Sequence, residues 1–95
     1  MTRFETPRVT IVGAGEIGRG WAALAVAAGW PVTIYDADSE VLSPAAEAIG
    51  DRVVSLVRHK RAEAQVAEDA LNLMRVGRSL LQAVEDADWI IEAVP

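Results

Sequence analysis

The chain has 95 residues, enough for one small domain and too few for two. Its composition is globular, at 52% hydrophobic and 24% charged residues, and no apolar run approaches the ~20 residues of a membrane-spanning helix. The formal net charge of −5, without a basic face, argues against nucleic-acid binding. Cysteine is absent, which excludes disulfides and thiolate metal sites. Residues 1–7 lack the apolar core of a secretory signal, so we expect a cytoplasmic protein.

Strand-like and helix-like patterns alternate along the chain, which predicts a Rossmann-type α/β fold with a parallel sheet and flanking helices. The expected strands span residues 8–12, 32–35, 74–76 and 88–94. The expected helices span residues 16–28, 39–62, 64–73 and 80–84. A complete domain of this type has about six strands, so we expect residues 1–95 to be its amino-terminal part, truncated after the fourth strand. That strand should lie beside the first and have an uncovered edge.

Two of the expected helices carry apolar residues at helical spacing. In the first helix, Gly29 is the expected cap and Trp21 is expected in the core. Its apolar face comprises Ile17, Trp21, Leu24, Ala25 and Ala28. In the second helix, proline fits only the first turn, so either Ser43 caps a helix that begins at Pro44 or a short turn from Ser39 precedes it. Its buried face comprises Ile49, Val53, Leu56 and Val57. In the fourth strand, Trp89 is compatible with either a core position or a ligand contact, because a buried parallel strand tolerates apolar residues on both faces.

A glycine motif lies between the first strand and the first helix. Residues 13–18 read G-A-G-E-I-G and match G-x-G-x-x-G, and Asp36 follows 18 residues later at the end of the next strand. Gly13 would let the chain turn sharply, Gly15 would let the backbone approach a pyrophosphate, and Gly18 would let the helix pack closely. The helix amino terminus would then present its N–H groups to the phosphates. The arrangement predicts a dinucleotide-binding site.

Asp36 is the residue expected to select the cofactor. Its carboxylate would accept hydrogen bonds from the adenosine ribose hydroxyls and would repel the 2′-phosphate of NADP. The neighbouring Ala37 and Asp38 provide no arginine for that phosphate. NAD is therefore the predicted cofactor. Two alternatives stay open: the glycines and Asp36 serve only packing and helix capping, or the cofactor is FAD, whose sites more often have glutamate at this place.

Several segments resemble the L-3-hydroxyacyl-CoA dehydrogenase family. They are IVGAGEIGRGWA at residues 11–22, VTIYD at 32–36, and AVEDADWIIEAVP at 83–95, which is similar to the family's fourth strand. The I-G-R-G-W-A run is most similar to the lambda-crystallin branch, which includes L-gulonate 3-dehydrogenase, and carnitine dehydrogenases are similar there too. The resemblance spans nearly the whole chain, although residues 39–73 contribute little to it.

The resemblance implies NAD-dependent oxidation of the 3-hydroxyl of a 3-hydroxyacyl-CoA, as in fatty acid metabolism, by a homodimer when full length. It also implies that the general-base histidine, its orienting glutamate and a helical carboxyl-terminal domain lie beyond Pro95. This chain would then hold no catalytic residue and be inactive alone. The cofactor positions that carry over are Gly13, Gly15, Glu16, Ile17, Gly18, Asp36 and Ala93. Two other functions stay open: a dehydrogenase of a free 3-hydroxy acid such as L-gulonate or carnitine, and a non-catalytic NAD-binding or structural protein.

Other polar residues are expected to lie on the surface. The single histidine, His59, stands among Arg58, Lys60 and Arg61 near a helix end, where cations interact favourably with the dipole. The alternative, implied by the resemblance, is that Lys60 or Arg61 contacts the phosphates of coenzyme A. Acidic residues near the carboxyl end have no His or Cys among them, so no metal site is expected; they are Glu85, Asp86, Asp88 and Glu92. The first two are expected in a solvated turn.

Overall fold

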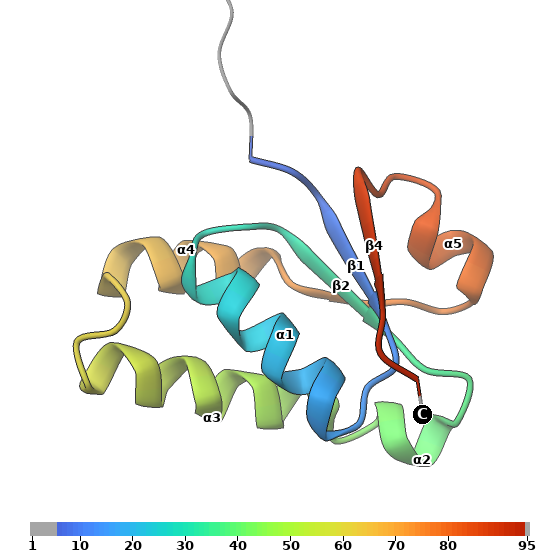
Figure 1. Ribbon diagram of the computed structural model, residues 1–95, viewed down its shortest axis with the longest axis horizontal. Coiled ribbons are helices and arrows are strands. Elements are labelled where there is room, and N and C mark those ends of the chain that lie inside the picture. Colours follow the sequence, from blue (N-terminus) through green and yellow to red (C-terminus); the bar gives the residue numbers. More distant parts are fainter. Residues whose placement is uncertain (1–5, 95) are drawn as a thin grey trace, which may run out of the picture.

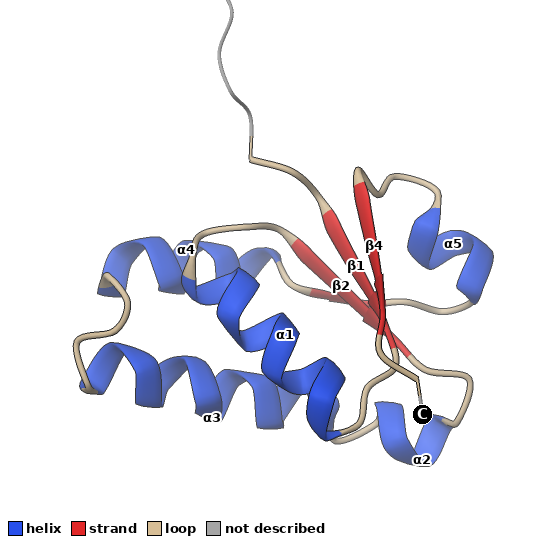
Figure 2. Ribbon diagram, in the orientation of Figure 1, coloured by secondary structure: helices blue, strands red, loops and turns tan. Residues whose placement is uncertain are grey.

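The computed structural model describes residues 6–94, in which strands and helices alternate (Figure 2). The strands are β1 Val9–Val12, β2 Val32–Tyr35, β3 Arg75–Val76 and β4 Trp89–Glu92. The helices are α1 Glu16–Ala27, α2 Ser39–Leu42, α3 Ala45–Arg58, α4 Ala64–Leu73 and α5 Leu80–Val84. Residues 1–5, which entered the argument about a secretory signal, and Pro95, which ends the family-like segment, lie outside the described residues.

The strands form one parallel sheet in the order β3-β2-β1-β4. β1 is central and pairs in register with β2 on one side and with β4 on the other. This order is the first part of the doubly wound arrangement, and it confirms the predicted Rossmann-type class and the place of the fourth strand beside the first. β4 forms the outer strand on its side of the sheet, as the sequence predicted.

Helices cover the two faces of the sheet unequally. Helices α1, α3 and α4 lie together on one face, and the short α5 lies on the other (Figure 1). The core fills the space between the sheet and helices α1, α3 and α4. Its largest fully buried side chains include Ile11, Ile34 and Ile49. None of the helices within residues 6–94 is long and apolar enough to cross a membrane.

Helix α1 buries a different face from the predicted one. Ile17, Trp21 and Leu24 are 69%, 50% and 56% exposed, so the expectation that Trp21 lies in the core is wrong. The buried residues of α1 are instead small: Gly18, Ala22, Ala23, Ala25 and Val26. Close packing of a helix on a sheet selects small side chains at the contact, whereas hydrophobicity alone ranks the larger residues on the other face higher. Ala25 is the one predicted position of this face that is buried.

Helix α3 follows the prediction more closely. Ile49 and Val53 are buried, whereas Leu56 and Val57 are only half-buried. At its start, Pro44 is the N-cap and the separate turn α2 precedes it, so the second of the two predicted starts is correct. Proline is tolerated there because the first residues of a helix have no intrahelical N–H bond to lose.

Both long helices end in left-handed caps. Gly29 has φ +95° and follows α1, with the Trp30 N–H bound to the Ala25 carbonyl at 3.0 Å, which confirms the predicted glycine cap. The corresponding residue after α3 is Lys60, with φ +60°. The helix therefore ends at Arg58, four residues before the predicted end at residue 62. Sequence patterns mark such caps by glycine, and a lysine in this conformation gives no such mark.

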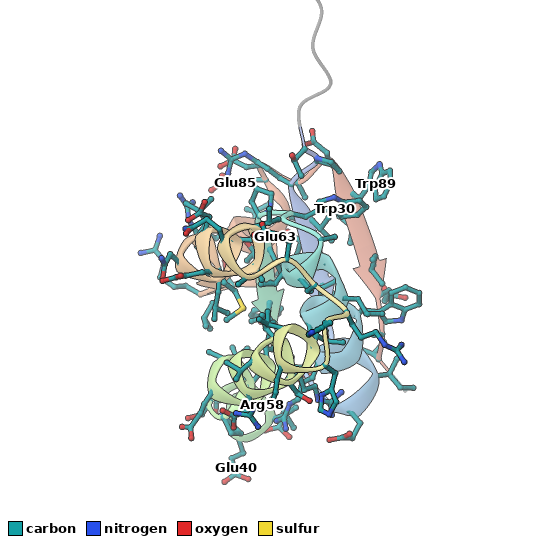
Figure 3. All side chains as sticks on the ribbon, turned by 90° about the vertical axis from the view of Figure 1, so that its left-hand side faces the viewer. Trp30, Glu40, Arg58, Glu63, Glu85 and Trp89 are labelled. Atoms are coloured by element: carbon teal, nitrogen blue, oxygen red, sulfur yellow. The ribbon has the colours of Figure 1, made fainter. Side chains whose placement is uncertain are left out.

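The outer strand β4 carries an exposed tryptophan. Trp89 is 54% exposed, and its ring meets the edge of Trp30 with centroids 5.3 Å apart and an interplanar angle of 79° (Figure 3). Ile90, the next residue, is exposed as well. Trp89 is therefore not a core residue, and the alternative of a ligand contact stays untested. The apolar surface of β4 is uncovered within the described residues, as expected.

Candidate functional site

The glycine loop joins β1 to α1 at the carboxyl edge of the sheet. Gly13 has φ +116°, and an added Cβ would lie 2.7 Å from the carbonyl carbon of Ala93. The Gly13 N–H donates to the Tyr35 carbonyl, and the Ala93 N–H donates to the Val12 carbonyl, both at 2.7 Å. Gly13 therefore allows the ends of β1, β2 and β4 to meet, which confirms the sharp turn predicted from the sequence.

The other two glycines of the motif have contrasting surroundings. A Cβ added to Gly18 would lie 1.7 Å from the Gly13 carbonyl oxygen, so this glycine brings the first turn of α1 against the loop, as predicted. A Cβ added to Gly15 would meet nothing within 4 Å. Gly15 thus has open space beside it, which is the condition for a ligand to approach the backbone closely.

Asp36 ties the end of β2 to the glycine loop. Its Oδ2 accepts the Ala14 N–H and its Oδ1 accepts the Asp38 N–H, both at 2.8 Å. The cap of α2 is Asp38, which accepts the Glu40 N–H at 2.9 Å, so the alternative that Asp36 caps the next helix is wrong. Each carboxylate oxygen can accept a second hydrogen bond. The half-buried Asp36 is held in one orientation and still has capacity for ligand hydroxyls.

Arg19 joins the same region, and the sequence argument missed it. Its Nε donates to the Ala14 carbonyl at 2.7 Å, and its Nη2 donates to the Val41 carbonyl at 3.1 Å. The half-buried guanidinium therefore connects the glycine loop with α2. The available signal was its position directly after Gly18, on the turn of α1 next to the loop.

These elements enclose a pocket of about 650 Å³. It lies at the carboxyl ends of β1, β2 and β4, where ligands bind in open parallel sheets. Five of the seven predicted cofactor residues line it, while Gly13 and Gly18 shape the loop behind it. Its lining residues are Gly15, Glu16, Ile17, Asp36, Asp38, Val41, Glu92, Ala93 and Val94.

The amino terminus of α1 opens at this pocket. Its N-cap is Gly15, which offers no side-chain acceptor to the first N–H groups. By contrast, Asp38, Glu63 and Ser79 each cap their helix through a side chain. The pocket thus combines three features: a helix amino terminus without a side-chain cap, the oriented carboxylate of Asp36, and apolar walls from Ile17 and Val41.

Comparison with known proteins decides the family. Residues 8–95 match the family described as 3-hydroxyacyl-CoA dehydrogenase, NAD binding domain. The chain belongs to this family. The cofactor of the domain is NAD, which confirms the prediction and decides against FAD.

Relatives from different organisms show similarity over nearly the same residues. The chain is 36% identical to the lambda-crystallin homolog of Rattus norvegicus over 88 residues, which cover 92% of this chain and 28% of the rat protein. It is 37% identical to L-carnitine dehydrogenase of Streptomyces coelicolor over 89 residues, 93% of this chain and 26% of that protein. A solved diketoreductase structure superimposes with a TM-score of 0.80 at 32% identity, covering 98% of this chain and 33% of that one. The chain therefore spans a third or less of the length of each.

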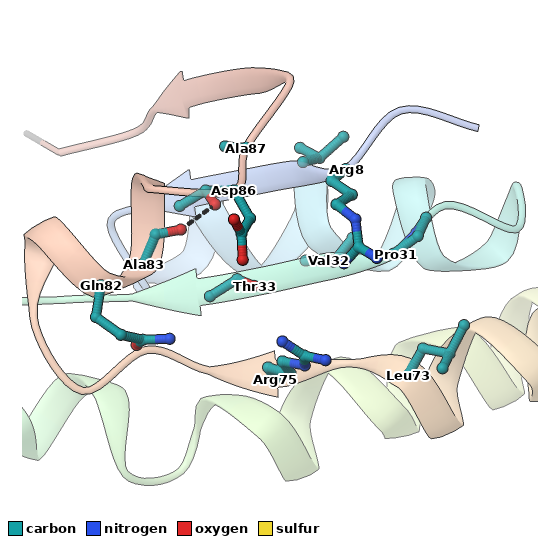
Figure 4. A pocket seen from close by; sticks show the side chains of 12 residues that line it. Arg8, Pro31, Val32, Thr33, Leu73, Arg75, Gln82, Ala83, Asp86 and Ala87 are labelled. Carbon is teal, nitrogen blue, oxygen red and sulfur yellow. Dashed lines mark hydrogen bonds between the residues drawn. The ribbon is translucent and has the colours of Figure 1, made fainter. Parts of the chain in front are cut away.

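A second, smaller pocket of about 100 Å³ lies on the α5 side of the sheet (Figure 4). Polar groups of Arg8, Arg75 and Asp86 border it, beside the amino-terminal halves of β1 and β2. The Thr10 hydroxyl, buried nearby, donates to the Ala83 carbonyl at 2.5 Å. In an open parallel sheet ligands bind at the carboxyl ends of the strands, so this pocket is separate from the candidate cofactor site.

The basic group at the end of α3 lies at the opposite end of that helix from α2 (Figure 1). His59 is exposed, as expected, with Nδ1 2.8 Å from the Ser55 carbonyl oxygen. Arg58, Lys60 and Arg61 are exposed with it, and the alternative that Lys60 or Arg61 contacts coenzyme A stays untested.

The acidic residues near the carboxyl end do not form a cluster. Glu85 and Asp86 are exposed in the turn after α5, as predicted. Asp88 accepts the Arg8 N–H at 2.8 Å and so aligns β4 with β1. Within residues 6–94, no group of three or more His, Cys, Asp or Glu residues could hold a metal ion.

Proposed function

We propose that this chain forms the adenosine and pyrophosphate portion of the NAD site in a dehydrogenase that oxidises the 3-hydroxyl of a 3-hydroxyacyl-CoA. The observation that supports it most is the convergence of Gly15, Asp36 and Ala93 on one pocket at the amino terminus of α1. NAD, when bound, accepts the hydride. The residues of this chain bind and orient the cofactor, and the catalytic histidine and glutamate belong to sequence beyond Pro95.

Each group in the pocket has a proposed task. The N–H groups of Glu16 and Ile17 bind the pyrophosphate, helped by the positive end of the α1 dipole. The Asp36 carboxylate accepts the adenosine ribose hydroxyls while its bonds to Ala14 and Asp38 keep it oriented. Arg19 positions α2 and does not contact the cofactor.

The substrate is the less determined part of the proposal. The family description supports a 3-hydroxyacyl-CoA. The similarity to L-carnitine dehydrogenase favours a free 3-hydroxy acid as the second candidate, and the similarity to lambda-crystallin keeps a non-catalytic role as the third. The full-length protein, which we expect to be a cytoplasmic homodimer, should be assayed by NADH absorbance with acetoacetyl-CoA, L-gulonate and carnitine. Turnover with the first supports our proposal, turnover with only the others supports the second candidate, and none supports the third.

The cofactor preference gives a direct test of Asp36. NADH should bind at least about tenfold more tightly than NADPH, because a 2′-phosphate would be placed against this carboxylate. Asp36→Ala should narrow that difference and also weaken NADH binding, since both the ribose acceptor and the partner of the Ala14 N–H are lost. Fluorescence titration of both cofactors measures this. Asp51→Ala, at an exposed acid on α3, is the control and should change neither affinity. Equal affinities in the unsubstituted protein would contradict the role of Asp36.

A further inference from the structure

Glu16 brings a negative charge to the start of α1. It is the first residue of the helix, within the glycine motif, and it lines the pocket together with three more acids, Asp36, Asp38 and Glu92. A first-turn carboxylate is attracted by the same N–H groups and the same dipole as a pyrophosphate. An anionic cofactor therefore meets repulsion here unless the Glu16 carboxylate is neutralised and turned aside.

Arg52 of α3 binds this carboxylate. Its Nη2 lies 2.6 Å from Oε2 of Glu16, and its Nη1 donates to the Glu16 carbonyl oxygen at 3.5 Å. The guanidinium lies against α1 at Gly20, where an added Cβ would be 3.4 Å from Nη1. Arg52 borders the groove between α1 and α3, which come together near their amino-terminal ends (Figure 1), and Glu16 borders both this groove and the candidate cofactor pocket. The ion pair thus draws the carboxylate toward α3.

We propose that Arg52 is a positioning residue for the dinucleotide. It neutralises Glu16 and holds its carboxylate on the α3 side of α1, which leaves the first-turn N–H groups to the pyrophosphate. This inference rests on the proposed NAD site. The ion pair itself adds little to folding stability, because the side chains of Arg52 and Glu16 are 37% and 81% exposed. Replacement of Arg52 therefore tests binding without loss of the fold.

The test is a double-mutant cycle on NADH affinity in the full-length protein, by fluorescence titration at low and high salt. Arg52→Met should weaken NADH binding about fivefold at low salt, and the loss should shrink at high salt because screening removes the repulsion from the freed carboxylate. Glu16→Gln should bind NADH at least as well as the unsubstituted protein. In the Glu16→Gln background, Arg52→Met should weaken NADH binding by less than about twofold, since no negative charge is left at residue 16 to neutralise. Arg58→Met, at an exposed arginine on the same helix, is the matched control and should leave NADH affinity unchanged.

Adenosine separates a charge effect from a change in pocket shape. It has no phosphate, so its affinity should be the same with and without Arg52. An equal loss of NADH affinity in both Glu16 backgrounds would overturn the inference, because Arg52 would then contact the cofactor directly. An Arg52→Met protein that binds NADH normally, or that loses adenosine binding as well, would also overturn it. If the unsubstituted protein binds no NADH at any salt concentration, the proposed NAD site itself fails.

Discussion

Gly15→Val should leave the protein folded and reduce NADH affinity by at least about a hundredfold. Gly15 has φ −78° and ψ −163°, an extended conformation that valine adopts readily. An added Cβ meets no atom within 4 Å, so the folded chain has room for the side chain. That room is the pocket at the start of α1, where the pyrophosphate must approach the backbone. The valine methyl groups would occupy this space.

Two measurements on the same sample separate binding from folding. Thermal unfolding followed by circular dichroism should give nearly the same midpoint for Gly15→Val as for the unsubstituted protein, while fluorescence titration should show no NADH binding at concentrations that saturate the latter. Gly50→Ala is a matched control, because Gly50 of α3 is another glycine whose added Cβ meets nothing within 4 Å, and it lies outside the pocket lining. A folded Gly15→Val protein with normal NADH affinity would show that the phosphates bind elsewhere.

The parts of the site that the sequence predicted are those set by local geometry. Each of these features requires one residue type at a fixed spacing. Gly13 makes the turn out of the strand, Gly18 allows the close approach at the start of the helix, and Asp36 is the acid at the end of the next strand. The bounds of β2 were predicted for the same reason, because V-T-I-Y is a short run of strand-forming residues between turn residues.

Contacts between distant segments left no such pattern. Arg52 and Glu16 are 36 residues apart in the sequence, and Arg19 and Val41 are 22 apart. Helical or strand periodicity does not predict contacts at such separations. The buried face of α1 was predicted wrongly because its fully buried side chains include the small Ala22 and Val26, while the larger Trp21 is half exposed. The substrate could not be predicted from these residues, since the pocket they line is the one that we propose for the adenosine half of the cofactor.

Gly18→Ala should destabilise the protein by at least about 3 kcal/mol, near the upper end of the usual cost of overpacking. Its Cβ would stand 1.7 Å from the Gly13 carbonyl oxygen and 2.7 Å from the carbonyl carbon. Both atoms are backbone, so no side-chain rotation relieves the overlap, and α1 would have to move away from the loop. That movement would loosen the packing around Ala22 and Val26 of α1, which are both fully buried.

Urea unfolding measures this effect, with the change read from the transition midpoint at constant slope. Gly50→Ala again supplies the comparison, because the same added methyl group in the interior of α3 has free space and should stabilise the protein by up to about 1 kcal/mol through better helix propensity. Two identical substitutions should therefore change stability in opposite directions. A Gly18→Ala protein as stable as the unsubstituted one would mean that α1 can shift on the sheet at little cost, and that the third glycine of the motif is not required by packing.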